Sequence, residues 1–156
     1  MVFDLSILSY VIPVVSIFIT YILGTFSSKK TRKLEVEKMR YETFYVPFMR
    51  HLLGGLPLMS EPHSFSAEAR ATFFDLIMKN TYLLGAQEAS LVPKYYESFS
   101  EMFEYEEGNL EYSDAPQKYD EAFTQFCLAS LLEAQKLSKL LKYPNLSKTI
   151  SRVLDF

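Results

Sequence analysis

The strongest pattern in the chain is a continuous apolar run near its start. From Leu5 to Ser28 no residue is charged, and a basic cluster follows directly. A helix over this run is about 36 Å long at about 1.5 Å per residue, which is enough to cross a hydrocarbon core about 30 Å thick. The pattern therefore predicts a single transmembrane helix, with residues 1–28 as a membrane anchor.

The basic cluster predicts the orientation of this anchor. Its members are Lys29, Lys30, Arg32 and Lys33. Basic residues favour the cytoplasmic side of a membrane, so we expect the N-terminus outside the cell and residues 29–156 in the cytoplasm. The same cations can contact anionic lipid at about 1 kcal/mol each, or they can be a simple stop-transfer flank.

A cleaved signal peptide is the alternative to an anchor. Such a peptide has a positive segment before its apolar run and a cleavage site of small residues. No Lys or Arg precedes Leu5, and Leu23-Gly24-Thr25-Phe26 is a poor cleavage site. These features favour the uncleaved anchor.

Beyond the anchor, apolar residues recur at helical spacing, and no segment alternates as a strand does. We predict a helix that leaves the membrane and ends near residue 48 or 53. Further helices are predicted over 66–84, 90–106 and 116–142, with a short one from residue 146. Gly54-Gly55-Leu56-Pro57 and Pro62 predict a loop over 54–66, longer than the usual connection of about 4–6 residues.

Residues with known preferences for helix ends assign the boundaries. Starts are assigned to Ser66, to Ser90 with Pro93 in the first turn, to Asp114 and to Asn145, and ends to Gly85 and Tyr143-Pro144. Asp114 with Gln117 resembles a loose capping box. Pro47 lacks a backbone N–H and should bend or end the first helix close to it.

The predicted fold is therefore all-α, with a transmembrane helix before a small cytoplasmic bundle of about four to five helices. Short connections between helices favour antiparallel neighbours, largely up and down. We divide the chain into the anchor, a juxtamembrane basic and aromatic helix over 29–53, the loop over 54–66, and the rest of the bundle over 67–156. The last short helix either closes this bundle or serves as a docking piece.

Charge and cysteine content exclude several classes of function. The chain has 16 basic and 19 acidic residues, a net charge of −3, so we expect no general attraction to nucleic acid. The charges are unevenly placed, because residues 97–121 contain nine acidic residues and one basic residue, Lys118. The single cysteine, Cys127, excludes an internal disulfide bond and fits a reducing compartment.

Two segments are candidate surfaces for a protein partner. Tyr41, Phe44, Tyr45 and Phe48 share one helical face, which could dock a partner's helix or transmit position from the anchor. Aromatic stripes at helical spacing usually form core, which instead predicts a buried seam against the second and fourth helices. The acidic stretch, with Glu104, Glu106, Glu107 and Glu111, is either a solvated face or the receptor for a basic partner.

Residues for catalysis or cofactor binding are sparse. His51 and His63 lack the cysteine or acidic helix spacing of a zinc site, and Ser64 and Ser66 lie near His63 without an orienting group. Cys127 lies on an apolar helix face, where a thiol is usually inert. No phosphate-binding loop and no calcium loop is present. We therefore expect no enzymatic activity, no cofactor and no metal.

The Tyr-x-x-Phe-Tyr-x-Pro stretch after a single span resembles one carried by small membrane proteins of Gram-positive bacteria and their prophages. The resemblance covers residues 41–48 and the layout of the chain, and it transfers no functional residue. It implies a bacterial or prophage setting, in which such a protein can stop another phage from entering the cell.

The sequence as a whole predicts a non-enzymatic, single-pass membrane protein. Its cytoplasmic bundle would bind or block another protein at the inner membrane surface. The alternatives are interference with phage infection, a self-assembling structural protein that forms homo-oligomers, or a membrane-tethered hydrolase. Gly24 is the only glycine within the span, so the span lacks the pair of glycines four residues apart that favours close packing of two membrane helices. Dimerisation of that helix is therefore not strongly encoded.

Overall fold

A computed structural model describes residues 28–54 and 61–153. Among these residues, no helix combines the length and the apolar character that crossing a membrane requires. The predicted span over Leu5–Ser28 lies outside the described residues, apart from its last position. The chain divides into two units, Met1–Glu37 and Lys38–Phe156. The described part of the first unit, residues 28–37, is helical and carries the basic cluster in solvent.

The described part of the chain contains helices and short turns and no strand, which confirms the all-α prediction. In the second unit the main helices are α2 (Val46–Gly54), α3 (Ala67–Lys79), α4 (Ala86–Glu106), α5 (Ala115–Leu141) and α6 (Leu146–Val153). A π-helical turn, Tyr41–Tyr45, precedes α2, and 3₁₀ turns occupy Pro62–Ser64, Thr81–Leu83 and Leu110–Tyr112. The prediction of a bundle of four to five helices is confirmed.

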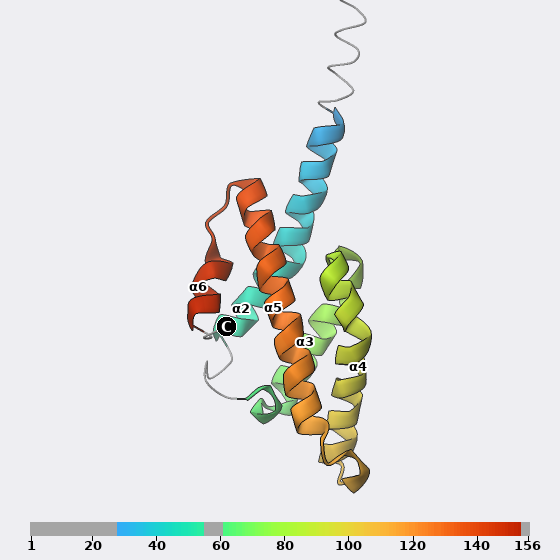
Figure 1. Ribbon diagram of the computed structural model, residues 1–156. Coiled ribbons are helices and arrows are strands. Elements are labelled where there is room, and N and C mark those ends of the chain that lie inside the picture. Colours follow the sequence, from blue (N-terminus) through green and yellow to red (C-terminus); the bar gives the residue numbers. More distant parts are fainter. Residues whose placement is uncertain (1–27, 55–60, 154–156) are drawn as a thin grey trace, which may run out of the picture. The chain divides into compact units, whose positions relative to one another are not determined.

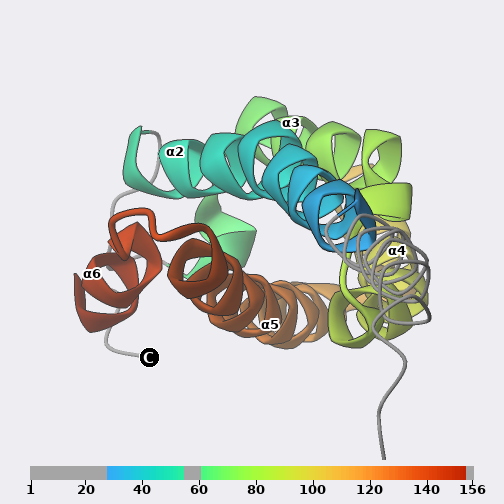
Figure 2. The same ribbon diagram turned by 90° about the horizontal axis from the view of Figure 1, so that it is seen from above.

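The helices of this unit alternate in direction along the chain (Figure 1). Helix α3 runs towards one end of the unit, α4 returns and α5 runs back beside it, so the predicted up-and-down order is seen. Viewed along the bundle, α5 lies between α4 and α6, and α2 lies across the bundle from this row (Figure 2). The long helix α5 thus packs on more than one side.

Aromatic side chains dominate the core. Its largest members with almost no exposed surface are Tyr45, Tyr95, Tyr119, Phe44, Phe48 and Phe126. Rings from α4 and α5 meet directly, as Tyr95 stacks on Phe126 with centroids 5.7 Å apart. Such side chains bury a large apolar area each, so a small unit can gain a stable core from few of them.

Pro47 is accommodated inside a helix that continues to Gly54, so it does not end the helix near residue 48. The preceding turn is widened, because the N–H of Val46 donates to the carbonyl of Tyr41 five residues back. A proline ring clashes with the carbonyl four residues before it, and a π turn relieves such crowding without breaking the helix. The later predicted end, near residue 53, agrees with the structure.

The boundary between the second and third predicted helices was wrong. The Ser66 cap is confirmed, since its hydroxyl accepts from the N–H of Ala69 at 3.2 Å. Helix α3 ends at Lys79. The side-chain amide of Asn80 donates to the carbonyl of Leu76 at 2.8 Å, while the backbone N–H of Asn80 donates to the carbonyl of Ile77 and so leaves the helical pattern. Gly85 does not end this helix but precedes α4. A side-chain carbon there would lie 2.6 Å from the Glu88 carboxylate, which would then have to shift.

The remaining helix boundaries agree with the predictions except at two starts. Helix α4 begins at Ala86, so Pro93 lies inside it and not in its first turn. Pro93 has no N–H to donate to the carbonyl of Ala89, four residues earlier. Because both residues are exposed, water can bond this carbonyl instead. Asp114 makes no side-chain cap and pairs with Lys118 at 3.2 Å instead. The Asn145 cap is confirmed by the N–H of Lys148 at 3.1 Å.

Helix α6 packs against α5 and so closes the bundle. Ile150 buries its side chain almost completely, whereas Leu146 stays half exposed. The chain reaches α6 through Lys142 in the left-handed conformation, with φ of 59°. The N–H of Tyr143 then donates to the carbonyl of Ser138 at 2.8 Å, a bond that ends α5.

Candidate functional site

The aromatic segment is part of the core. Phe44, Tyr45 and Phe48 have no exposed surface, and Tyr41 is also buried. The Phe48 ring contacts Phe73 of α3 at 5.6 Å and Phe126 of α5 at 6.0 Å, both edge to face. This is the buried seam against the second and fourth predicted helices. In the described fold these rings offer no surface to a partner's helix.

A buried polar network lies beside this aromatic seam. The hydroxyl of Tyr45 donates to the carboxylate of Glu88 at 2.8 Å. Arg40 donates to the Leu83 carbonyl at 2.7 Å and to the Glu133 carboxylate at 3.1 Å. Burial raises the pKa of Tyr45 and that of Glu88 above their ordinary values. Because these groups bond to one another, the network joins the elements that carry them.

The acidic stretch separates into structural and exposed carboxylates. Glu106 pairs with Arg70, whose side chain is 4% exposed. Arg70 also donates to the carbonyls of His63 and Phe65. Glu101 pairs with Lys118 of α5 at 2.9 Å. A buried guanidinium needs an opposite charge to offset its lost hydration. We therefore assign Glu106 to the ion pair that stabilises the fold and not to a surface for another protein.

The other carboxylates singled out from the sequence lie in solvent. Over the described residues, no cation comes within ion-pair distance of Glu104, Glu107 or Glu111. Two apolar side chains are exposed beside them, with Phe103 at 56% and Leu110 at 81%. We call these five residues the acidic end. They lie on the last turn of α4 and in its connection to α5, where these two helices meet at one end of the unit (Figure 1).

An apolar groove between α3 and α4 adjoins the acidic end. Its volume is about 270 Å³, and it is lined by Ala67, Arg70, Ala71, Phe99, Met102, Phe103 and Glu106. Phe103 belongs to both features. The groove exists because α3 presents alanines opposite the larger side chains of α4. It has room for an apolar side chain, next to the carboxylates of the acidic end.

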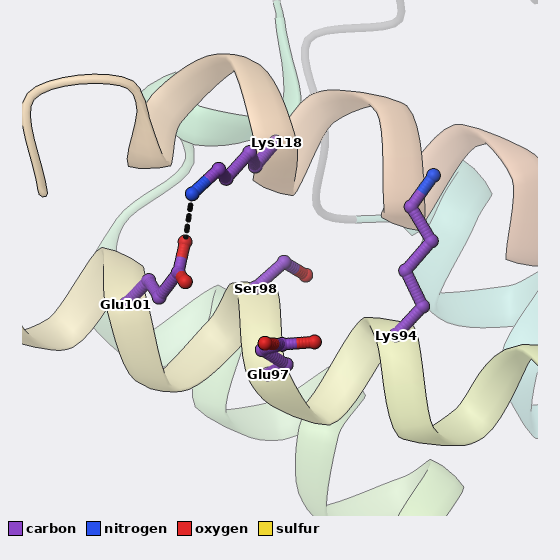
Figure 3. A pocket seen from close by; sticks show the side chains of 5 residues that line it. All are labelled: Lys94, Glu97, Ser98, Glu101 and Lys118. Carbon is purple, nitrogen blue, oxygen red and sulfur yellow. Dashed lines mark hydrogen bonds and ion pairs between the residues drawn. The ribbon is translucent and has the colours of Figure 1, made fainter.

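A second pocket, of about 210 Å³, lies between α4 and α5 (Figure 3). Its lining residues are Lys94, Glu97, Ser98, Glu101 and Lys118. Both lysines donate hydrogen bonds to neighbouring side chains. Lys118 donates to the carboxylate of Glu101 (Figure 3), and Lys94 donates to the side-chain amide oxygen of Gln125 at 3.2 Å. Hydrogen bonds to Glu101 and Asp114 raise the pKa of Lys118. The hydroxyl of Ser98 donates to the carbonyl of Tyr95, so this pocket holds no activated nucleophile.

The histidines and the cysteine occupy separate places. His51 contacts the Phe73 ring at 6.0 Å, and burial raises the pKa of Cys127, which keeps its thiol protonated. The hydroxyl of Ser64 donates to the Glu61 carbonyl, and Ser66 caps α3, so neither serine is activated by His63.

His63 instead meets Asp120, 57 residues away on α5. Sequence analysis did not anticipate this pair, because no spacing in the sequence relates a loop residue to a distant helix. A loop histidine and a helical aspartate meet only once the fold is known.

The basic cluster, Lys29, Lys30, Arg32 and Lys33, is exposed on the helix of the first unit. Its contact with lipid stays a prediction. Comparison of the chain with models of protein families, with curated proteins and with solved structures finds no match.

Proposed function

We propose that the chain is a non-enzymatic membrane protein whose helical bundle binds another protein at the inner membrane surface and thereby recruits or blocks it. The acidic end is the observation that carries this proposal. Three carboxylates that no cation of the described residues pairs with lie close in sequence to two exposed apolar side chains, beside a groove of about 270 Å³. Neither the three carboxylates nor these two apolar side chains belong to the described core, so their placement favours binding.

The chemistry of the acidic end specifies its partner. A segment with several Lys or Arg residues would be drawn to Glu104, Glu107 and Glu111, which raises the rate of encounter more than the affinity. An apolar side chain of that segment would enter the groove between α3 and α4 and remove the exposed face of Phe103 from water. The partner is therefore a basic segment with at least one large apolar residue.

The apolar run and the basic cluster support the membrane part of the proposal. An anchor holds the bundle within reach of the membrane surface, which raises its effective concentration for partners there. Lys29, Lys30, Arg32 and Lys33 would add contacts to anionic lipid on the cytoplasmic side.

The test reverses the charge of the acidic end in the full-length chain. The variant E104K/E107K/E111K leaves Glu106 intact, since reversing Glu106 would strip Arg70 of its partner and confound binding with folding. The control, D75K/E97K/E121K, changes the net charge equally at exposed positions elsewhere. Partners are cross-linked in membranes and identified for the wild type and both variants.

We expect a partner rich in Lys and Arg to be captured by the wild type and by the control, and to be reduced at least about tenfold with the acidic-end variant, a loss of about 1.4 kcal/mol. Equal capture by all three proteins would contradict the proposal. Capture of the chain's own copies alone would replace it with self-assembly.

A further inference from the structure

Three side chains with metal-binding atoms converge where the segment before α3 lies against α5. Glu61, His63 and Asp120 each place one such atom within 4.8 Å of the others. Two of them come from one short segment, and Asp120 comes from α5. Imidazole nitrogen with carboxylate oxygen is a donor set that zinc and related divalent transition metals bind.

Asp120 holds His63 by two contacts. One carboxylate oxygen accepts from the backbone N–H of His63 at 2.6 Å, and the other lies 2.7 Å from Nδ1 of its ring. Arg70 fixes the same residue from the other side by donating to the His63 carbonyl at 2.8 Å. A proton on Nδ1 directed at Asp120 leaves Nε2 as the lone-pair nitrogen, as in a histidine prepared for a metal ion.

The second ring nitrogen faces a further carboxylate. Nε2 of His63 lies 3.7 Å from Oε2 of Glu61. Two ligand atoms that bind one zinc ion at about 2.0–2.2 Å with tetrahedral angles are about 3.4 Å apart. The Glu61 side chain is 77% exposed, so it can shift by a few tenths of an ångström at little cost.

We propose that this cluster is a binding site for a divalent transition-metal ion such as Zn²⁺. His63 Nε2 and Glu61 Oε2 ligate the ion, water completes the coordination, and Asp120 orients the imidazole through Nδ1. The ion would join Glu61 to His63 within the segment before α3, which the hydrogen bonds of Asp120 already hold against α5. The site is separate from the acidic end and does not depend on the proposed function.

The test uses the full-length chain in detergent, purified with an affinity tag that contains no histidine. Titration with Zn²⁺ is followed by calorimetry, and Co²⁺ is used as a spectroscopic substitute whose visible absorption reports its ligands. The variants are H63Q, E61Q and D120N. The matched controls are H51Q, the other histidine of the chain, and E121Q, the neighbour of Asp120 on α5.

We expect saturable binding of one Zn²⁺ by the wild type and by both controls. H63Q should lose it, E61Q should weaken it, and D120N should weaken it about 10–100-fold, as for other carboxylates that orient a ligating histidine. Because E61Q changes an exposed side chain, its effect is measured on an intact fold, which circular dichroism without metal verifies.

Either of two results would overturn the proposal. One is the absence of saturable binding by the wild type at millimolar Zn²⁺, which would leave the cluster as an ion pair between His63 and its carboxylates. The other is an affinity that H63Q and E61Q leave unchanged, or that H51Q lowers as much as H63Q does.

Discussion

The aromatic seam and the acidic end contain the same kind of side chain in opposite surroundings. Phe48 is fully buried between Phe73 and Phe126, whereas Phe103 is 56% exposed although buried Met102 precedes it and lines the same groove. The difference lies in what faces each ring. Large rings of α3 and α5 cover Phe48, while Ala67 and Ala71 lie across the groove from Phe103. An aromatic residue thus becomes core or surface according to the size of the side chains opposite it.

The largest expected effect is on the seam. Phe48→Ala should lower the free energy of unfolding of the bundle by about 3–5 kcal/mol, since it removes a buried ring from a packed core. The matched change Phe103→Ala should stay within about 0.5 kcal/mol, as for surface substitutions generally. Urea unfolding followed by circular dichroism measures both. Equal losses for the two variants would contradict the comparison.

The next effect distinguishes two neighbouring carboxylates. Glu106→Gln should cost about 1–3 kcal/mol, because it removes the charged partner of buried Arg70. Glu104→Gln, two positions away, should change the free energy of unfolding by no more than about 0.5 kcal/mol. The same unfolding measurement applies. If Glu104→Gln were the more harmful change, the assignment of Glu104 to the exposed surface would be wrong.

A smaller effect concerns the dependence of stability on pH. Burial raises the pKa of Glu88 above its ordinary value of 4.5, with Tyr45, Arg40 and Glu133 around it. Its stabilising contribution is therefore fully present below about pH 4.5, and it is lost as pH rises through the raised pKa. Glu88→Gln should remove this decline from the unfolding free energy measured between pH 4.5 and 8. Glu104→Gln should keep it, and a decline unchanged in Glu88→Gln would refute the assignment.

The helices could be predicted from the sequence because their apolar periodicity and capping residues are local. Ser66 and Asn145 cap helices as their residue types predict, and the end of α4 at Glu106 follows from the pattern alone. Gly85 was misassigned because its role depends on the Glu88 and Glu133 side chains that pack against it. Packing between helices has no local signal.

The candidate surfaces were only partly predictable for the same reason. The acidic stretch was visible as a run of charge, but the run does not reveal that Glu106 is paired with buried Arg70. The seam was visible as a helical stripe, and either burial or docking was consistent with its spacing. The meeting of His63 with Asp120 had no signal, since these residues approach only through the tertiary fold.

The most direct test of the central claim is photo-cross-linking from the acidic end in living cells. A benzophenone amino acid would replace Leu110 in the full-length chain, and Leu132, half exposed on α5, would be the control position. We predict an adduct with one basic protein from position 110, none from position 132, and loss of the adduct when E104K/E107K/E111K is added. Equal adducts from both positions, an adduct only with the chain itself, or an adduct unaffected by the charge reversal would contradict the account.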